Sequence, residues 1–179
     1  WMTAGKGVQH SEMFPLLSRE HENPLELFQI WLNLPKKGKY VDAYFQMIWN
    51  EDVPLITEKD KNGKEITIKI VAGNYSNNKA VAPPPDSWAA SEDHDVAIWV
   101  ISLDAESNWI LPKANEDVNR NLYFFEGESI EIANEEIPAY KGVELNPSSD
   151  IAIKNGAKPS RLLLLQGKPI NEPVVQQGP

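Results

Sequence analysis

The chain has 179 residues, no cysteine, and 26 acidic against 17 basic side chains, which gives a net charge of −9 at pH 7. The absence of cysteine excludes a disulfide framework, a thiolate zinc site, an iron–sulfur cluster and a cysteine nucleophile, and the longest apolar runs are far shorter than the roughly 20 residues of a membrane-spanning helix. Residues 91–179 carry 15 acidic and 7 basic groups, against 11 and 10 in residues 1–90, so the second half would repel phosphate backbones and we expect no direct nucleic-acid binding.

Short apolar stretches rich in β-branched and aromatic residues recur along the chain, and each ends at Gly, Pro or Asn. Helical periodicity is scarce, so the pattern is typical of many short strands in a sandwich or barrel. In chain order the expected strands are Val8–Phe14, Leu25–Leu34, Ala43–Trp49, Ile66–Ala72, Val96–Leu103, Asn121–Glu126, Ser129–Ile132, Val143–Leu145, Ser149–Lys154 and Arg161–Gly167. The sequence therefore predicts an all-β chain of one large domain or two small ones.

Two connections carry clear turn signals. Asn62-Gly63 lies between apolar stretches at 55–57 and 66–70, and this dipeptide favours a two-residue hairpin loop with positive φ at both positions. The segment 74–95 contains three consecutive prolines, which lack the backbone donor that a sheet ladder needs. We therefore expect a long irregular connection there, inside a domain, with Trp88 to bury.

His10 and Glu12 are the first candidates for chemistry. They are two residues apart in an extended stretch, so their side chains are expected to project to the same face. An imidazole nitrogen and a carboxylate oxygen together suit a first-row divalent metal. Two ligands do not make a site, and a solvent-facing polar pair is the alternative interpretation of the same spacing.

The remaining candidate groups favour structural roles. His21 is interpreted as an exposed loop histidine, and His94, with three acidic neighbours, as part of a solvated charge run rather than a cation site. Phosphate-binding loops and the nucleophile elbow of hydrolases are absent from the sequence. Core packing is expected for one set of aromatic residues, with the lining of a pocket for a flat aromatic ligand as the alternative. This set is Phe28, Trp31, Trp49, Trp99, Trp109, Tyr123 and Phe124.

Three ordered strings resemble the pirin family. They are WMTAGKGVQHSEM at residues 1–13, LFQIWLNLP at 27–35 and LLQGKPINEPVVQQGP at 164–179. The resemblance implies tandem jelly-roll barrels, that is, a bicupin whose first barrel is incomplete in this chain. Residues 1–48 would be the closing part of the N-terminal, metal-binding cupin, and residues 49–179 the C-terminal cupin.

The resemblance also implies a metal site. In the family a His-x-Glu pair supplies one histidine and one glutamate to a single divalent metal, most commonly iron, and His10 and Glu12 match those two positions. The other two histidines of the family site come from an upstream His-x-His motif that this sequence does not contain. Half of the ligand set is therefore expected outside this chain, which resembles a piece trimmed at both ends.

Two functions follow from the resemblance. The first is a metal-dependent dioxygenase of the quercetin 2,3-dioxygenase type, with a flavonol-like aromatic substrate and Glu12 as the base that accepts its hydroxyl proton. The second is a non-enzymatic, redox-sensitive regulator that binds a transcription-related protein, for which the acidic second half would suit a basic protein surface. A cupin with a vestigial site is a third possibility. A monomer in the cytoplasm, without a membrane segment, is expected in each case.

Overall fold

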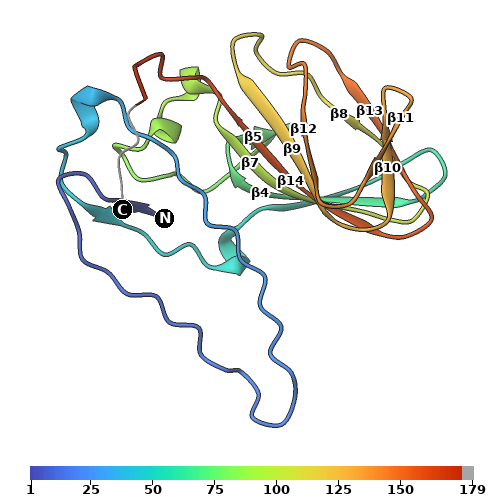
Figure 1. The fold of residues 1–179 in the computed structure, drawn as a ribbon, viewed down its shortest axis with the longest axis horizontal. Coiled ribbons are helices and arrows are strands. Elements are labelled where there is room, and N and C mark those ends of the chain that lie inside the picture. Colours follow the sequence, from blue (N-terminus) through green and yellow to red (C-terminus); the bar gives the residue numbers. More distant parts are fainter. Residues whose placement is uncertain (175–179) are drawn as a thin grey trace.

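The chain folds into two antiparallel β-sheets that face each other, with a long loop extending from one side (Figure 1). The computed structural model describes residues 1–174. In chain order the strands are β1 (Met2–Thr3), β2 (Tyr44–Phe45), β3 (Leu55–Lys59), β4 (Glu65–Ala72), β5 (Asn74–Tyr75), β6 (Asn78–Lys79), β7 (Ala97–Leu103), β8 (Asn108–Leu111), β9 (Asn119–Glu126), β10 (Ser129–Ile132), β11 (Glu135–Pro138), β12 (Lys141–Glu144), β13 (Ile151–Asn155) and β14 (Ser160–Gly167).

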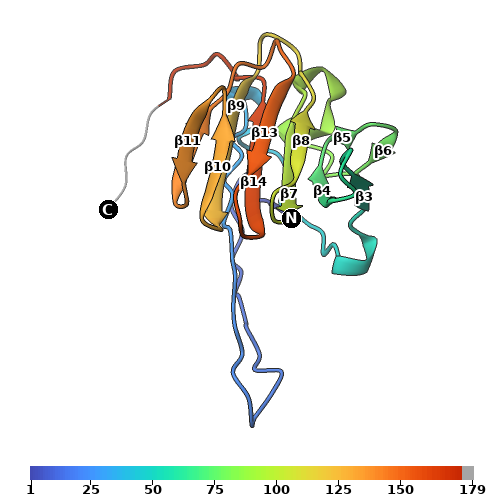
Figure 2. The ribbon, with the colours of Figure 1, turned by 90° about the vertical axis from the view of Figure 1, so that its right-hand side faces the viewer.

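The two main sheets form a sandwich of the jelly-roll kind (Figure 2). One sheet has six strands in the order β12-β9-β14-β7-β4-β3, and the other has four in the order β11-β10-β13-β8. Every ladder is antiparallel, and β1-β2 and β5-β6 are separate short pairs. Single turns of 3₁₀ helix occur at Lys36–Gly38, Asn50–Asp52, Trp88–Ala90 and Glu92–His94. Among residues 1–174, no helix has the length and apolar character needed to cross a membrane.

The core lies between the two sheets. In β4, Ile66, Ile68 and Ile70 are at most 1% exposed, and they alternate with half-buried residues because successive side chains of a strand point to opposite faces. The central strand β14 is apolar on both faces. Leu162 and Leu164 lie in the main core, whereas Leu163 packs on the outer face of the sheet. The prediction of an all-β chain is confirmed.

Most predicted strands after residue 50 are confirmed with shifts of one or two residues, but the first part of the chain differs. Residues 8–14 and 25–34 form no ladder in the described structure, so these two strand predictions are wrong. Of the predicted strand Ala43–Trp49, only Tyr44–Phe45 pairs, with β1. Residues 8–34, here called the long loop, are instead extended and mostly exposed (Figure 1).

The hairpin around Asn62-Gly63 is confirmed, but its loop is longer than predicted. The amide of Asp60 donates to the carbonyl of Lys64, which leaves residues 61–63 as the turn, and only Gly63 has a positive φ, of 79°. The two-residue turn with two positive φ angles occurs elsewhere, at Ala133-Asn134 between β10 and β11. Segment 74–95 is largely irregular, as expected, but it also contains the small β5-β6 hairpin.

The expectation of core packing is correct for only part of the aromatic set. Trp99, Trp109 and Phe124 are buried in the core. Trp31 is 85% exposed and Trp49 is 63% exposed, because both lie in the N-terminal part that joins neither main sheet. Phe28 and Tyr123 are also exposed, at the sheet surface. The domain boundary between residues 48 and 49 stays a prediction, although both main sheets lie after it.

Candidate metal ligands and the wall of the barrel

His10 and Glu12 lie on the outgoing arm of the long loop. Both residues are exposed, and within the described part of the chain neither side chain makes a hydrogen bond or an ion pair. Neither side chain is therefore committed to a hydrogen bond or an ion pair with another described residue. No third histidine, aspartate or glutamate among residues 1–174 is placed to hold a metal ion together with them.

The neck of the long loop is fixed by backbone contacts. Lys6 donates its amide to the carbonyl of Val41 at 2.9 Å, and the Lys6 side chain forms an ion pair with Asp42. Gly5 has a φ of +51°, and a Cβ placed there would lie 2.1 Å from the Val41 oxygen. The chain can enter the loop in this way only because residue 5 is glycine.

The tip and the return arm of the loop are held as well. The Asn23 side-chain oxygen accepts the amides of Leu17 and Ser18 at 2.9 Å each, which closes the tip. On the return arm the ring of Phe28 meets Phe125 edge-on, with centroids 4.8 Å apart. The outgoing arm that carries His10 has no comparable anchor among the described contacts.

The nitrogen and oxygen donors of His10 and Glu12 suit a divalent metal, but two ligands do not complete a metal site. Structural and catalytic sites usually have three or four protein ligands. In residues 1–174, no group of three or more histidine, aspartate and glutamate side chains is placed to hold a metal ion. These residues alone therefore do not fit a closed metal centre.

The other two histidines are placed differently from each other. His21 is exposed at the loop tip, as predicted. His94 is not part of a freely solvated charge run, because its ring stacks on Trp88 with centroids 3.3 Å apart and its Nδ1 lies 2.6 Å from the Trp88 carbonyl oxygen. Trp88 in turn donates its indole N–H to the carbonyl of Lys168 at 2.8 Å. His94 therefore helps to fasten segment 74–95 to the end of β14.

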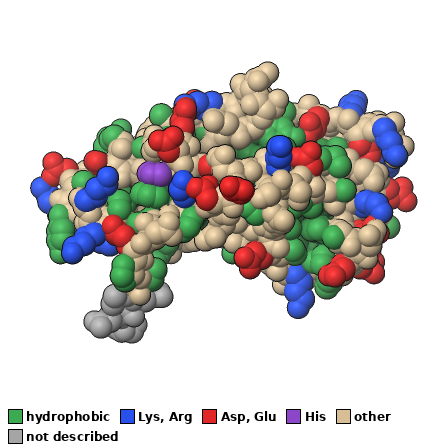
Figure 3. All heavy atoms as spheres, turned by 90° about the horizontal axis from the view of Figure 1, so that it is seen from above, with side chains coloured by type: hydrophobic (Ala, Val, Ile, Leu, Met, Phe, Trp, Pro, Cys, Tyr) green, Lys and Arg blue, Asp and Glu red, His purple; other side chains and the backbone are tan. Residues whose placement is uncertain are grey.

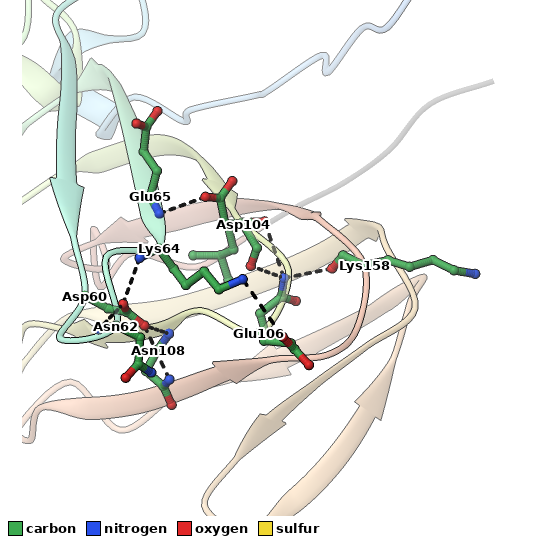
Figure 4. A network of polar contacts seen from close by, with 10 residues as sticks. Asp60, Asn62, Lys64, Glu65, Asp104, Glu106, Asn108 and Lys158 are labelled. Carbon is green, nitrogen blue, oxygen red and sulfur yellow. Dashed lines mark hydrogen bonds and ion pairs between the residues drawn. The ribbon is translucent and has the colours of Figure 1, made fainter.

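A polar network that sequence reasoning missed lies at one end of the barrel (Figure 4). The Asp60 carboxylate accepts the amides of Asn62 and Lys64 with one oxygen and the amide of Asn108 with the other, at 2.7 to 3.0 Å. Burial acts to raise the pKa of Asp60, but these backbone hydrogen bonds outweigh it and lower the pKa below its ordinary value of 3.8. Asp60 thereby ties the β3-β4 turn to β8.

A second missed group is the carboxylate of Glu58 on β3. Its Oε1 accepts the hydroxyl of Tyr75 and, at 2.9 Å, the indole N–H of Trp109. Burial and the bond to Glu58 raise the pKa of Tyr75 above its ordinary value of 10.0. The sequence held one signal for this group: Glu58 is two residues from the core-packed Ile56 and therefore shares its inward face.

Comparisons with known proteins match the whole chain. A protein of Pseudomonas aeruginosa named "Putative quercetin 2,3-dioxygenase" is 31% identical over 182 residues, which is 100% of this chain and 59% of that protein. A pirin-like protein of Solanum lycopersicum is 30% identical, over 100% of this chain and 56% of its own length. The chain thus spans less than two thirds of the length of these relatives.

The fold is also that of solved structures. A quercetin 2,3-dioxygenase from Acinetobacter baumannii superposes with a TM-score of 0.67 at 22% identity, over 83% of this chain and 48% of that one. The family model of the pirin C-terminal cupin domain matches residues 98–179, of which 175–179, the end of the third pirin-like string, lie outside the described residues. The chain is all-β with a cupin fold, its residues 98–179 match the C-terminal cupin domain of pirins, and its whole length is similar to pirin-like proteins.

Proposed function

We propose that the protein containing this chain is a metal-dependent cupin oxygenase that acts on a flavonol-like aromatic compound. The observation that carries the proposal is the His10–Glu12 pair, a nitrogen and an oxygen donor on exposed side chains that form no hydrogen bond or ion pair with the described residues. The match over the whole chain to a protein named as a quercetin 2,3-dioxygenase candidate supports the reaction class.

His10 and Glu12 are proposed to hold one divalent metal, iron in the first instance, together with ligands from outside this chain. Residues 1–48 would then belong to the metal-binding cupin and residues 49–179 to the second cupin. When bound, the metal would supply Lewis-acid and redox chemistry. Glu12, whose carboxylate has no other partner in the described residues, is the proposed base for the substrate hydroxyl proton.

The test measures metal content and quercetin turnover in the natural protein that contains these residues. We expect about one divalent metal per chain and metal-dependent loss of quercetin. His10→Ala and Glu12→Gln should each abolish turnover, and His10→Ala should also lower the metal content. His21→Ala and Glu22→Gln are the matched controls, because these exposed residues lie at the tip of the same loop and outside the pair. Retention of metal and turnover in both His10→Ala and Glu12→Gln would overturn the proposal.

A second candidate is the regulator that binds a protein partner, favoured by the excess of eight negative charges in residues 91–179. On the face shown in Figure 3, however, acidic and basic side chains lie interspersed. Stoichiometric metal without any loss of quercetin or related flavonols would contradict the oxygenase and favour this alternative.

A further inference from the structure

A cavity of about 450 Å³ opens in the wall of the barrel, where β3, an edge of the six-stranded sheet, meets β8, an edge of the four-stranded sheet. Figure 2 shows these strands near each other on one side of the sandwich. The volume of this cavity falls within the range of binding sites for small molecules. The lining residues are Glu58, Lys59, Asp60, Lys61, Ile66, Tyr75, Asn108, Trp109 and Ile110.

The walls of this cavity are suited to a flat ring. Tyr75 and Trp109 line it with the small part of each residue that the core leaves exposed, 7% and 3%, and their ring centroids lie 6.5 Å apart with planes inclined by 36°. Ile66 and Ile110 add aliphatic surface, and Ile110 is 55% exposed at the strand edge. Aromatic rings pack favourably on such surfaces in offset or edge-on arrangements.

One acceptor on the cavity wall is fixed in place and only half used. Glu58 Oε1 accepts hydrogen bonds from both Tyr75 and Trp109, which are 7% and 3% exposed. Glu58 Oε2 accepts none from the described residues. By contrast, both oxygens of the neighbouring Asp60 are occupied by amides (Figure 4). Because two buried donors hold the Glu58 carboxylate, its free oxygen is a preorganised acceptor for a ligand donor.

The charge around the cavity favours a neutral ligand. Lys59 and Lys61 line it and form no ion pair with a described residue. They balance the carboxylates of Glu58 and Asp60, so neither a cation nor an anion is strongly favoured. The hydroxyl of a phenol is a neutral donor attached to an aromatic ring. A phenol therefore suits the free oxygen of Glu58, the aromatic lining and the balanced charge of the cavity.

We propose that this cavity binds a small neutral phenol, whose hydroxyl donates to Glu58 Oε2 and whose ring packs against Trp109 and Tyr75. The site lies between the edges of the two main sheets and uses neither His10 nor Glu12, so it stands independently of the oxygenase proposed above.

The test follows the Trp109 indole N–H by nuclear magnetic resonance while resorcinol is added to the full, nitrogen-15-labelled chain. Trp109→Phe identifies this signal among the six tryptophans. We expect a saturable shift with a dissociation constant on the order of 1 mM, as is usual for so small a ligand. The dimethyl ether, 1,3-dimethoxybenzene, has the same ring without a donor and should bind at least about tenfold more weakly.

Variants locate the site. Glu58→Gln keeps an amide oxygen for Tyr75 and Trp109 but turns the remaining position into a donor, so resorcinol binding should fall by about tenfold or more. Glu135→Gln, an exposed glutamate on β11, should bind as the wild type does. Ile110→Arg, at an exposed edge position, should block the cavity even if Glu58→Gln folds poorly. His10→Ala should leave resorcinol binding unchanged, which separates this site from the proposed metal site.

Three results would each overturn the proposal. These are the absence of a saturable shift, equal binding of resorcinol and its dimethyl ether, and unchanged binding in a folded Glu58→Gln or Ile110→Arg variant.

Discussion

Arg161 on β14 forms a two-pronged ion pair with Glu26 on the long loop. Its Nη1 lies 2.5 Å from Oε2 and its Nη2 lies 2.7 Å from Oε1, across 135 positions of sequence. Burial acts to lower the pKa of Arg161, but the hydrogen bonds to Glu26 and Glu126 outweigh it and raise the pKa. The guanidinium also lies 5.1 Å from the centroid of the Phe125 ring. This pair is the main polar anchor of the return arm on the outer face of the six-stranded sheet.

Arg161→Lys should loosen that anchor without unfolding the protein. Lysine keeps the charge but cannot donate two parallel hydrogen bonds to one carboxylate. We expect the nitrogen-15 order parameters of residues 26–30 to fall, while the free energy of unfolding changes by less than about 1 kcal/mol because the pair is partly exposed. Lys158→Ala, which removes an exposed pair with Glu128 elsewhere, is the control. Ile30 packs against the apolar cluster around Leu163 on the outer face of the sheet, and Phe28 meets Phe125. Unchanged order parameters in Arg161→Lys would show that these apolar contacts hold the arm alone.

Tyr75 should make the protein sensitive to alkali. Its pKa is raised in the folded state by burial and by Glu58, so the folded protein keeps a proton that the unfolded chain loses. The resulting stability is fully present below the unfolded pKa of about 10 and is lost as the pH rises above it. Thermal unfolding midpoints should therefore fall more steeply above pH 10 in the wild type than in Tyr75→Phe. Parallel curves for the two proteins would contradict this assignment.

The strands of the two main sheets were largely predictable, because the order of apolar and polar residues along each strand matches the faces that the fold buries. β4 alternates core and surface residues, and β14 is apolar on both faces because both faces are covered. The strands predicted at 8–14 and 25–34 show the same local pattern but lack a partner strand in the described structure. Alternating apolar and polar residues indicate an extended backbone. A sheet also requires a partner strand, which the local pattern of one segment does not identify.

The opposite error occurred at β11. Glu135–Pro138 has little apolar content, and it forms a strand because the Ala133-Asn134 turn folds it back on β10. The proline is tolerated because β11 is an edge strand. This turn has positive φ angles at an alanine and an asparagine. Composition alone does not indicate such a turn, because it depends on the packing of the folded chain.

The candidate sites differ in the same way. The pairing of His10 with Glu12 rests on their spacing of two positions in the sequence, and it stays a prediction. Glu58, Tyr75 and Trp109 come from three strands, so only the fold brings their polar atoms together. Glu58 lies two residues from Ile56 on the same strand, so the sequence indicates that its carboxylate shares the face that packs on the core. The sequence does not identify the donors that bind this carboxylate.

Arg120 on β9 is a buried charge that we expect to be replaceable. Its side chain is 1% exposed, Nη1 donates to the carbonyl of Pro112 at 2.7 Å, and Nε has no partner among the described residues. Burial lowers its pKa, and Asp95 and Asp150 only partly offset this effect. Arg120→Met should therefore stay within about 1 kcal/mol of the wild-type free energy of unfolding.

Arg120→Ala is the matched comparison, because it removes the same charge but leaves a cavity in the core. We expect a loss of about 2 to 4 kcal/mol in the free energy of unfolding, measured by urea denaturation. Equal losses in the methionine and alanine variants would show that the charge itself, rather than the volume of the side chain, holds this end of the barrel.

Asp60→Asn should destabilise the protein at neutral pH, because an amide group would place a donor opposite backbone amides that now meet a carboxylate oxygen. The hydrogen bonds lower the pKa of Asp60 in the folded state, so its contribution is present above the unfolded pKa, near 3.8, and is lost as the pH falls below it. The difference in thermal midpoint between the wild type and Asp60→Asn should therefore shrink as the pH falls from 7 toward 3. Asp86→Asn, at an exposed position without a hydrogen bond to a described residue, should show no such dependence. A difference that stays constant over this pH range would mean that Asp60 holds the β3-β4 turn by shape and not by its charge.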